Sequence, residues 1–146
     1  MAINQVYEDF SRIQLLAPTA TAINVGDVLV FGKGTKAMVG VAQTAQAASG
    51  SPVYDDNSGF ITVQVSGVVQ LTVLGQVSKS PSAGGAINRG DPVFADGGVF
   101  DPTSGITTGN TVDADTGGTF VGIAMDPVLA GASTSIRVIL KNGLGS

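Results

Sequence analysis

The sequence predicts an all-β protein, and three observations lead to this fold class. Apolar and polar residues alternate with the two-residue period of a strand from Ile61 to Val73. Glycine is abundant, with 21 residues, and it gathers with Asp, Asn and Ser in turn-like clusters. A Gly-Asp pair that leads into an apolar run occurs once in each half of the chain. Many short strands with Gly-rich turns indicate a compact β-sandwich or small barrel, so we expect one of these with little helix.

The clearest strand signal is the run from Ile61 to Val73. Its odd-numbered positions are apolar, apart from the hydrogen side chain of Gly67, and its even-numbered positions are mostly polar. This pattern is typical of a strand with one buried face. Because a bend or bulge is easiest at glycine, we expect either one long strand bent at Gly67 or two strands that share one phase.

Shorter apolar or β-branched runs predict the remaining strands. They span residues 28–31, 38–42, 92–95, 98–100, 120–124 and 135–140. The first of these runs is apolar throughout, as in a strand that is covered on both faces. Asp96-Gly97-Gly98 has the composition of a turn, so we expect it to separate two short strands. Only residues 42–49 and 127–132 could hold a short turn of helix.

The chain also contains a loose internal repeat, within about residues 23–74 and 87–141. Three blocks recur in the same order: 25–31 with 89–94, 39–42 with 121–124, and 61–65 with 135–139. The second copy carries a Thr- and Gly-rich insertion at about residues 98–119. We interpret the repeat as two related β units that share one core, within a single β domain of residues 23–146. Residues 1–22 lie outside the repeat, and we expect them to form an extended N-terminal arm.

The composition argues against several classes of function. The chain has no Cys and no His, which excludes disulfides and thiolate metal sites and removes the commonest general base. A net charge of −4 with scattered basic residues argues against nucleic-acid binding. There is no stretch of about 20 mostly apolar residues for a membrane span, and the first residues lack the pattern of a secretory signal, so we expect synthesis in the cytoplasm. Because 43% of residues are hydrophobic and only 12% are charged, we expect an uncharged surface that contacts other protein.

Three motifs have a chemical interpretation and a simpler structural one. Arg89-Gly90-Asp91 is the tripeptide that integrins bind, but the first copy of the repeat has Val25-Gly26-Asp27 at the same place, which favours a turn. Residues 31–36 lack the spacing of a phosphate loop and indicate a hairpin turn. The acidic clusters at 55–59 and 113–115 lack the EF-hand pattern, so we interpret both as exposed turns. The sequence therefore predicts no catalytic, cofactor-binding or metal-binding residues.

The ordered series of motifs resembles a family of bacteriophage proteins. The motifs are Gly-Asp with an apolar run (26–31), Val-Gly-Val-Ala (39–42), Ile-Thr-Val-Gln-Val-Ser-Gly-Val-Val (61–69), Gly-Asp-Pro-Val-Phe (90–94), Val-Gly-Ile-Ala (121–124) and Ile-Arg-Val-Ile-Leu (136–140). Over about residues 23–141 the chain is similar to capsid cement, or head decoration, proteins. The resemblance implies a structural virion protein rather than an enzyme, similar in role to the head decoration protein of phage lambda. It also implies a homotrimer on the exterior of the expanded head, where it bridges major capsid proteins, with no cofactor.

Four apolar residues of the arm are the candidate contact site: Ile3, Val6, Tyr7 and Phe10. They lie outside the repeat, and an extended arm can add a strand to the edge of a capsid sheet. An arm that packs on its own core or on a trimer mate is an equal alternative. The alternative function is a surface module that recognises glycan or receptor, although two Tyr and no Trp weigh against glycan stacking. A hydrolase is a third hypothesis, which the lack of His and Cys disfavours.

Overall fold

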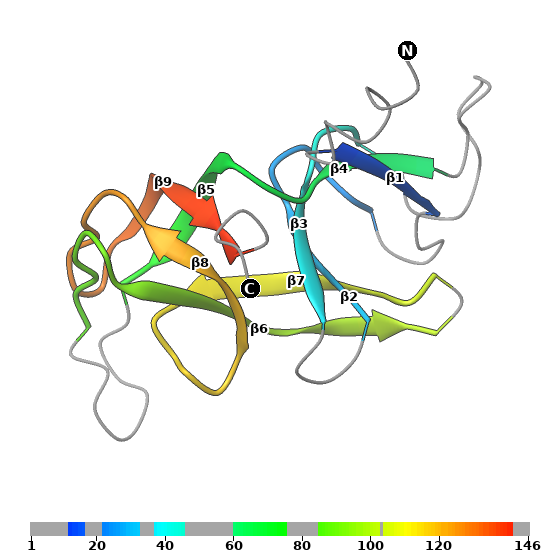
Figure 1. Ribbon diagram of the computed structural model, residues 1–146. Coiled ribbons are helices and arrows are strands. Elements are labelled where there is room, and N and C mark those ends of the chain that lie inside the picture. The colour runs from blue at the N-terminus through cyan, green and yellow to red at the C-terminus, as the bar shows by residue number, and fades with distance from the viewer. Residues whose placement is uncertain are drawn as a thin grey trace, which may run out of the picture.

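The computed structural model describes residues 12–16, 22–32, 37–45, 60–75, 85–102 and 104–141. These residues form nine strands and no α-helix, which confirms the all-β class (Figure 1). The strands are β1 (Arg12–Leu16), β2 (Val28–Phe31), β3 (Met38–Ala42), β4 (Phe60–Gln64), β5 (Val68–Leu74), β6 (Pro92–Asp101), β7 (Ile106–Asp113), β8 (Thr119–Ala124) and β9 (Ser133–Leu140). The described part of the chain therefore has no helix that is long and apolar enough to cross a membrane.

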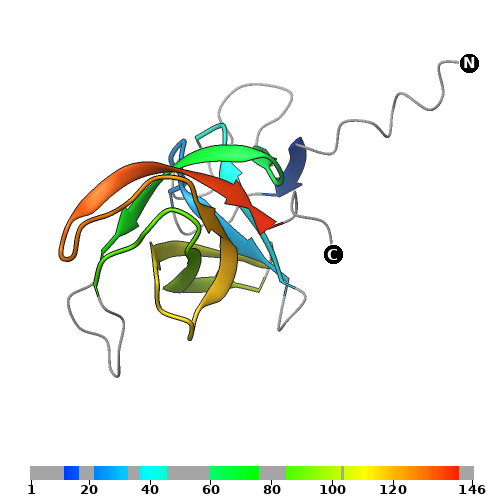
Figure 2. The ribbon, with the colours of Figure 1, turned by 60° about the vertical axis from the view of Figure 1, so that its left-hand side comes forward.

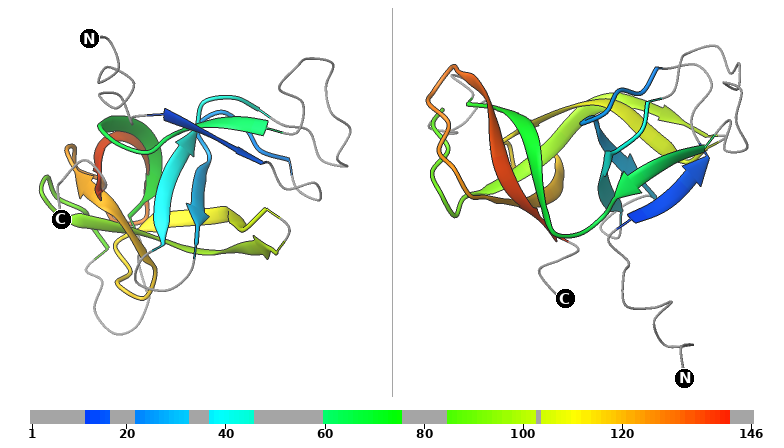
Figure 3. Two further views of the ribbon diagram at one scale, coloured as in Figure 1. Left: turned by 45° about the vertical axis from the view of Figure 1, so that its right-hand side comes forward. Right: turned by 90° about the horizontal axis from the view of Figure 1, so that it is seen from above.

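All nine strands belong to one antiparallel sheet with the order β1-β4-β3-β2-β7-β6-β8-β9-β5. The sheet is strongly curled (Figures 2 and 3), but β1 and β5 at its two ends do not pair with each other, so no barrel closes. The expectation of a two-sheet sandwich or a small barrel is therefore corrected to a single, open, curled sheet. Local sequence patterns specify strands, whereas closure depends on which distant strands pair.

The alternating run from Ile61 to Val73 forms two strands that share one phase, which is the second of the two expected forms. The buried side chains are Ile61, Val63, Val65, Val69, Leu71 and Val73, each at most 6% exposed. Between the strands, Gly67 has a φ of 88°, and its carbonyl oxygen accepts a hydrogen bond of 2.9 Å from the backbone N–H of Leu140. The chain thus passes from β4, near one end of the strand order, to β5 at the other end while the same face stays inward.

The core consists of two clusters of buried side chains on either side of β2. Val28 and Val30 belong to the larger cluster, with β5, β6, β8 and β9, whereas Leu29 belongs to the smaller cluster, with β4. The prediction that residues 28–31 form a strand covered on both faces is therefore confirmed for these three residues. Burying both faces of β2 explains why this run is apolar at successive positions.

The expected turn at Asp96-Gly97-Gly98 is wrong, because β6 continues through it. Gly97 and Gly98 have φ values of 71° and 76°, and Gly97 pairs with Asn110 of β7. A Cβ at Gly98 would lie 2.6 Å from the carbonyl oxygen of Thr108, so glycine permits the close approach of the two strands. The expected insertion at 98–119 supplies the end of β6 and the whole of β7, which pairs with both β6 and β2.

The helical turns that the sequence allowed are also not found among the described residues. Residues 127–132 form turns around an isolated β-bridge between Ile87 and Val128. Ala42 ends β3, and residues 46–49 lie outside the described part of the chain.

The two Gly-Asp segments are turns with the same hydrogen bonds. Gly26 and Gly90 both have a φ of 94°, and each donates its N–H over 2.8 Å, to the carbonyl oxygen of Ala42 and of Ala124 respectively. In each turn the aspartate Oδ2 accepts a bond of 2.8 Å from the backbone N–H three residues earlier. Arg89-Gly90-Asp91 is therefore a turn that leads into β6, as the structural interpretation predicted.

The match between the two halves is shifted by one residue in its last block. The N–H groups of Gln43 and Met125, which follow the matching strands β3 and β8, donate over 2.8 Å to the carbonyl oxygens of Thr62 and Arg137. Thr62 thus matches Arg137, whereas the sequence alignment placed Val63 there. With this correspondence, buried residues of one half match buried residues of the other half. A shift of one residue would match the buried face of one strand with the exposed face of the other.

Replacing Gly122 in β8 with alanine should destabilise the protein by about 3 kcal/mol. A Cβ at this position would overlap the backbone carbonyl group of Ile139, which cannot move without disturbing the β8–β9 ladder. Gly117→Ala is the control, because a Cβ there meets only the Asp115 carboxylate, at 3.3 Å from Oδ1. Urea unfolding measures both variants, and equal midpoints would contradict the close approach of β8 and β9.

Candidate interaction surfaces

The described residues contain no cluster of titratable side chains that could hold a metal ion. Asp113 and Asp115 instead accept backbone hydrogen bonds in the β7–β8 turn. Asp113 Oδ1 accepts a bond of 2.8 Å from the N–H of Asp115, and Asp115 Oδ1 accepts one of 2.9 Å from the N–H of Gly117. Asp113 is fully buried, so the expectation of an exposed acidic turn at 113–115 is wrong at this residue. The other acidic cluster, at 55–59, lies outside the described residues.

The four contact residues predicted from the sequence, Ile3, Val6, Tyr7 and Phe10, lie outside the described part of the chain. The arm expected at residues 1–22 does contain a described strand, β1, which pairs with β4 along its whole length. Ile13 and Leu15 of β1 are half-buried against the smaller core cluster. Residues 12–16 therefore belong to the sheet.

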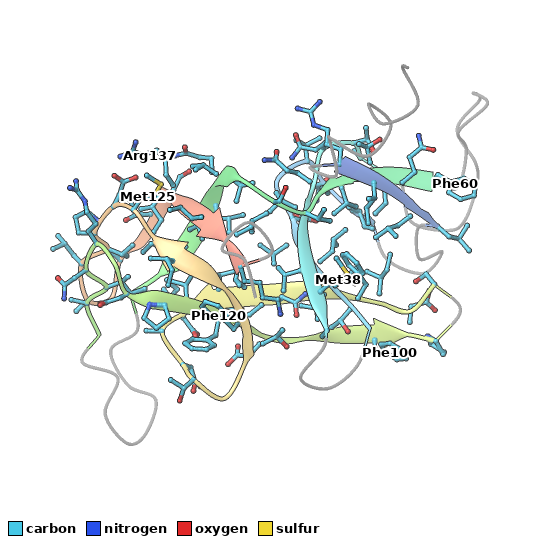
Figure 4. All side chains as sticks on the ribbon, in the orientation of Figure 1. Met38, Phe60, Phe100, Phe120, Met125 and Arg137 are labelled. Atoms are coloured by element: carbon cyan, nitrogen blue, oxygen red, sulfur yellow. The ribbon has the colours of Figure 1, made fainter. Side chains whose placement is uncertain are left out.

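The hairpin formed by the end of β6 and the start of β7 presents apolar side chains to solvent. Val99 is 69% exposed and Phe100 is 40% exposed. β8 pairs with β6 only at Pro92–Ala95, so the hairpin extends beyond β8. Figure 4 shows the Phe100 side chain on the outer side of this hairpin. We call residues 97–101 with 105–108 the β6–β7 hairpin.

The β6–β7 hairpin is held in place by buried residues of its β7 strand and by hydrogen bonds at its tip. Ile106 and Thr108 are buried, and Phe31 of β2 pairs with Ile106. At the tip, Asp101 Oδ2 accepts bonds from the Ser104 N–H (3.1 Å) and hydroxyl (2.6 Å). The exposed apolar residues are therefore presented on an ordered scaffold.

Sequence reasoning missed this surface because it interpreted residues 98–119 as a turn-rich insertion. A signal was present: Val99-Phe100 and Ile106-Thr107-Thr108 are two β-favouring runs separated by a short segment with Pro and Gly, which is typical of a hairpin. The high glycine content of the segment concealed it.

Two adjoining hollows of about 370 and 270 Å³ lie between β5 and β7 and share Thr72, Asn110 and Val112. Asn110 Nδ2 donates to the carbonyl oxygens of Val28 (3.1 Å) and Thr107 (2.9 Å), so its amide connects β2 to β7. Asp27 is the single charged residue in the two linings, and its Oδ2 already accepts a bond in its own turn. These hollows do not bring together the titratable groups that a hydrolase needs.

An ion pair joins the end of β8 to β9. Arg137 donates from Nη2 to Asp126 Oδ1 (2.8 Å) and from Nε to Asp126 Oδ2 (3.0 Å), and its backbone N–H also donates to Oδ2 (3.0 Å). The hydrogen bond from the Arg137 side chain, followed by the one from its backbone, holds the pKa of Asp126 well below its ordinary value of 3.8. The same pair raises the pKa of Arg137. Elsewhere, burial lowers the pKa of Lys141, whose Nζ donates to the carbonyl oxygen of Ala37 over 2.6 Å.

The described residues thus form an open β sheet that exposes apolar side chains on a packed hairpin. The sequence model of a family described as "Phage cement protein" matches residues 8–140. The chain therefore belongs to the phage cement protein family, which confirms the resemblance found in the sequence. No curated protein and no solved structure matched the chain. Family membership makes the protein a structural component of a phage capsid rather than an enzyme.

The Asp126–Arg137 pair should make stability depend on pH in acid. A carboxylate whose pKa is lower in the folded than in the unfolded state stabilises the protein above its unfolded pKa of about 4. This contribution is lost as the pH falls through the folded pKa. The difference in unfolding free energy between the wild type and Asp126→Asn should therefore be largest near neutral pH and shrink below about pH 4. Urea unfolding at a series of pH values checks this, and Arg137→Gln should behave in the same way. A difference that stays constant with pH would contradict the pairing.

Proposed function

We propose that this capsid component binds the exterior of the expanded phage head as a homotrimer and bridges neighbouring major capsid proteins. The observation that carries the proposal is the β6–β7 hairpin, which displays Val99 and Phe100 on a well-packed base. Membership of the cement family supports a role in holding capsid subunits together. An interface core that lacks charge and contains aromatic residues is typical of contacts between proteins.

Bridging requires at least two contact surfaces on one molecule, and we propose that the chain consists of two related β units. Two observations support this. The Gly-Asp turns have the same hydrogen bonds, and the strand order β1-β4-β3-β2 on one side of β7 parallels β5-β9-β8-β6 on the other. Related units at the two ends of one sheet offer surfaces to two neighbouring subunits. Several modest contacts then add up to strong attachment through multivalency.

We also propose that the start of the N-terminal arm adds to this attachment. Ile3, Val6, Tyr7 and Phe10 all precede β1, whose pairing with β4 anchors the arm to the sheet at Arg12. Eleven residues can extend roughly 35 Å, which is enough to reach a neighbouring subunit. The arm then follows the strand-addition mode of recognition.

Val99→Asp should weaken binding to expanded heads by about tenfold or more, because it places a charge in an apolar contact. The protein is mixed with emptied, expanded heads, sedimented, and imaged for density on the head exterior. Val25→Asp is the matched control: Val25 is 65% exposed, in the turn before β2 and outside the hairpin. Both variants should unfold at the wild-type urea concentration. Equal binding of the two variants would refute the role of the hairpin.

Deleting residues 1–11 should reduce binding to heads without unfolding the protein. The deletion removes the four apolar arm residues but leaves β1, which covers part of the smaller core cluster. A deletion that extended through residue 16 would expose that cluster and confuse lost contacts with lost stability. Sedimentation with heads measures binding and urea unfolding measures stability. Undiminished binding would rule out the arm as a capsid contact.

A further inference from the structure

A shallow pocket of about 330 Å³ lies between the turn at Gly90 and strands β8 and β9. The half-buried apolar side chains of Ile123, Met125 and Ile139 line it, together with Arg89 and Arg137. Two of the three arginines of the chain therefore meet at one place on a protein whose net charge is −4. In Figure 4, Met125 and Arg137 lie at the end of the molecule opposite Phe100.

The guanidinium group of Arg89 is held in position but keeps donors available. Its Nε donates to the carbonyl oxygen of Met125 over 3.0 Å, which fixes the side chain beside the pocket. No described residue accepts a hydrogen bond from its two terminal nitrogens. The carboxylates nearby are already in use: Asp126 binds Arg137, and Asp91 Oδ2 accepts a bond from the N–H of Asn88. Arg89 is thus the cation of this pocket whose guanidinium group forms no hydrogen bond to a carboxylate of the described residues, although its charge also acts on Asp126.

The other half of the sheet shows that the fold does not require these charges. There, the N–H of Thr62 donates to Thr44 Oγ1 over 3.0 Å, at the place where the N–H of Arg137 donates to Asp126 Oδ2 over the same distance. A neutral pair of threonines therefore supports the same backbone arrangement. The ion pair supplies a charged surface that the turn itself does not need.

The position of Arg89 is occupied by an uncharged residue in the other half of the sheet. In the first half this position holds Val25, and the turn at Gly26 has the same φ and the same hydrogen bonds as the turn at Gly90. The arginine therefore adds nothing that the turn requires. Its place in a pocket lined by apolar side chains instead matches the composition of protein interfaces, where Arg and Met are enriched.

We propose that this pocket binds a carboxylate side chain of the major capsid protein, with an apolar neighbour of that carboxylate resting on Ile123 and Ile139. This inference rests on the proposed function. The two terminal nitrogens of Arg89 match the two oxygens of a carboxylate, which gives a short, charge-assisted, bidentate contact. The pocket and the β6–β7 hairpin then bind at opposite ends of one molecule, as a bridge between subunits requires.

Charge reversal tests the pocket. Arg89→Glu should weaken binding to expanded heads by about tenfold or more, because it sets like charges against each other in the contact. Arg12→Glu is the matched control: it makes the same change in net charge at an exposed residue of β1, and its binding should stay within about twofold of the wild type. Arg89→Val, which copies the first turn, should fold as well as the wild type and bind less tightly.

Each other outcome overturns the inference. Equal binding of Arg89→Glu and Arg12→Glu would show that the pocket does not contact the head. A changed oligomeric state of Arg89→Glu, measured by sedimentation of the protein without heads, would assign the pocket to a second copy of the chain. If the wild type itself does not bind expanded heads, the proposed function fails, and this inference fails with it.

Discussion

The curled sheet depends on one constraint, which is that the chain crosses at Gly67 from one end of the strand order to the other without changing its inward face. A positive φ at this residue makes the bend, and Leu140 of β9 fixes it through the Gly67 carbonyl oxygen. The buried alternation from Ile61 to Val73 therefore contributes to both core clusters. Any residue with a Cβ would be strained there, because L-residues rarely adopt this conformation.

A comparison of the two Gly-Asp turns shows which residues the backbone of the turn requires and which residue can vary. Each turn needs a glycine with positive φ and an aspartate that accepts a backbone N–H, and both turns have them. The residue before the glycine is free to differ, and it is Val25 in one turn and Arg89 in the other. The same backbone conformation can thus present an uncharged surface in one half and a charged surface in the other.

Much of the fold could be predicted because its signals are local. Alternating burial, the apolar run at Val28 and the Gly-Asp turns all follow from residues that are neighbours in sequence. The path of β6 could not be predicted in this way. Two successive glycines such as Gly97 and Gly98 are typical of a turn, but they also fit a strand that twists. Closure of the sheet could not be predicted either, since it depends on the pairing of strands that are distant in sequence.

The surfaces were harder to predict than the strands for the same reason. Val99 lies on a hairpin whose partner strand is contained in the supposed insertion, and the pocket at Arg89 needs residues from β8 and β9 as well as the turn. Composition indicated that the surface would be poor in charge. Only the arrangement of strands shows where apolar side chains and arginines gather.

The position of β7 between β2 and β6 has a mechanical consequence. β7 shares backbone hydrogen bonds with β2 on one side and with β6 on the other, and these two strands lead in opposite directions to the two ends of the sheet. A force that pulls on β7 is therefore spread as shear along both ladders. The bonds of the two ladders then resist together, whereas a strand at the margin of a sheet would peel away one bond at a time.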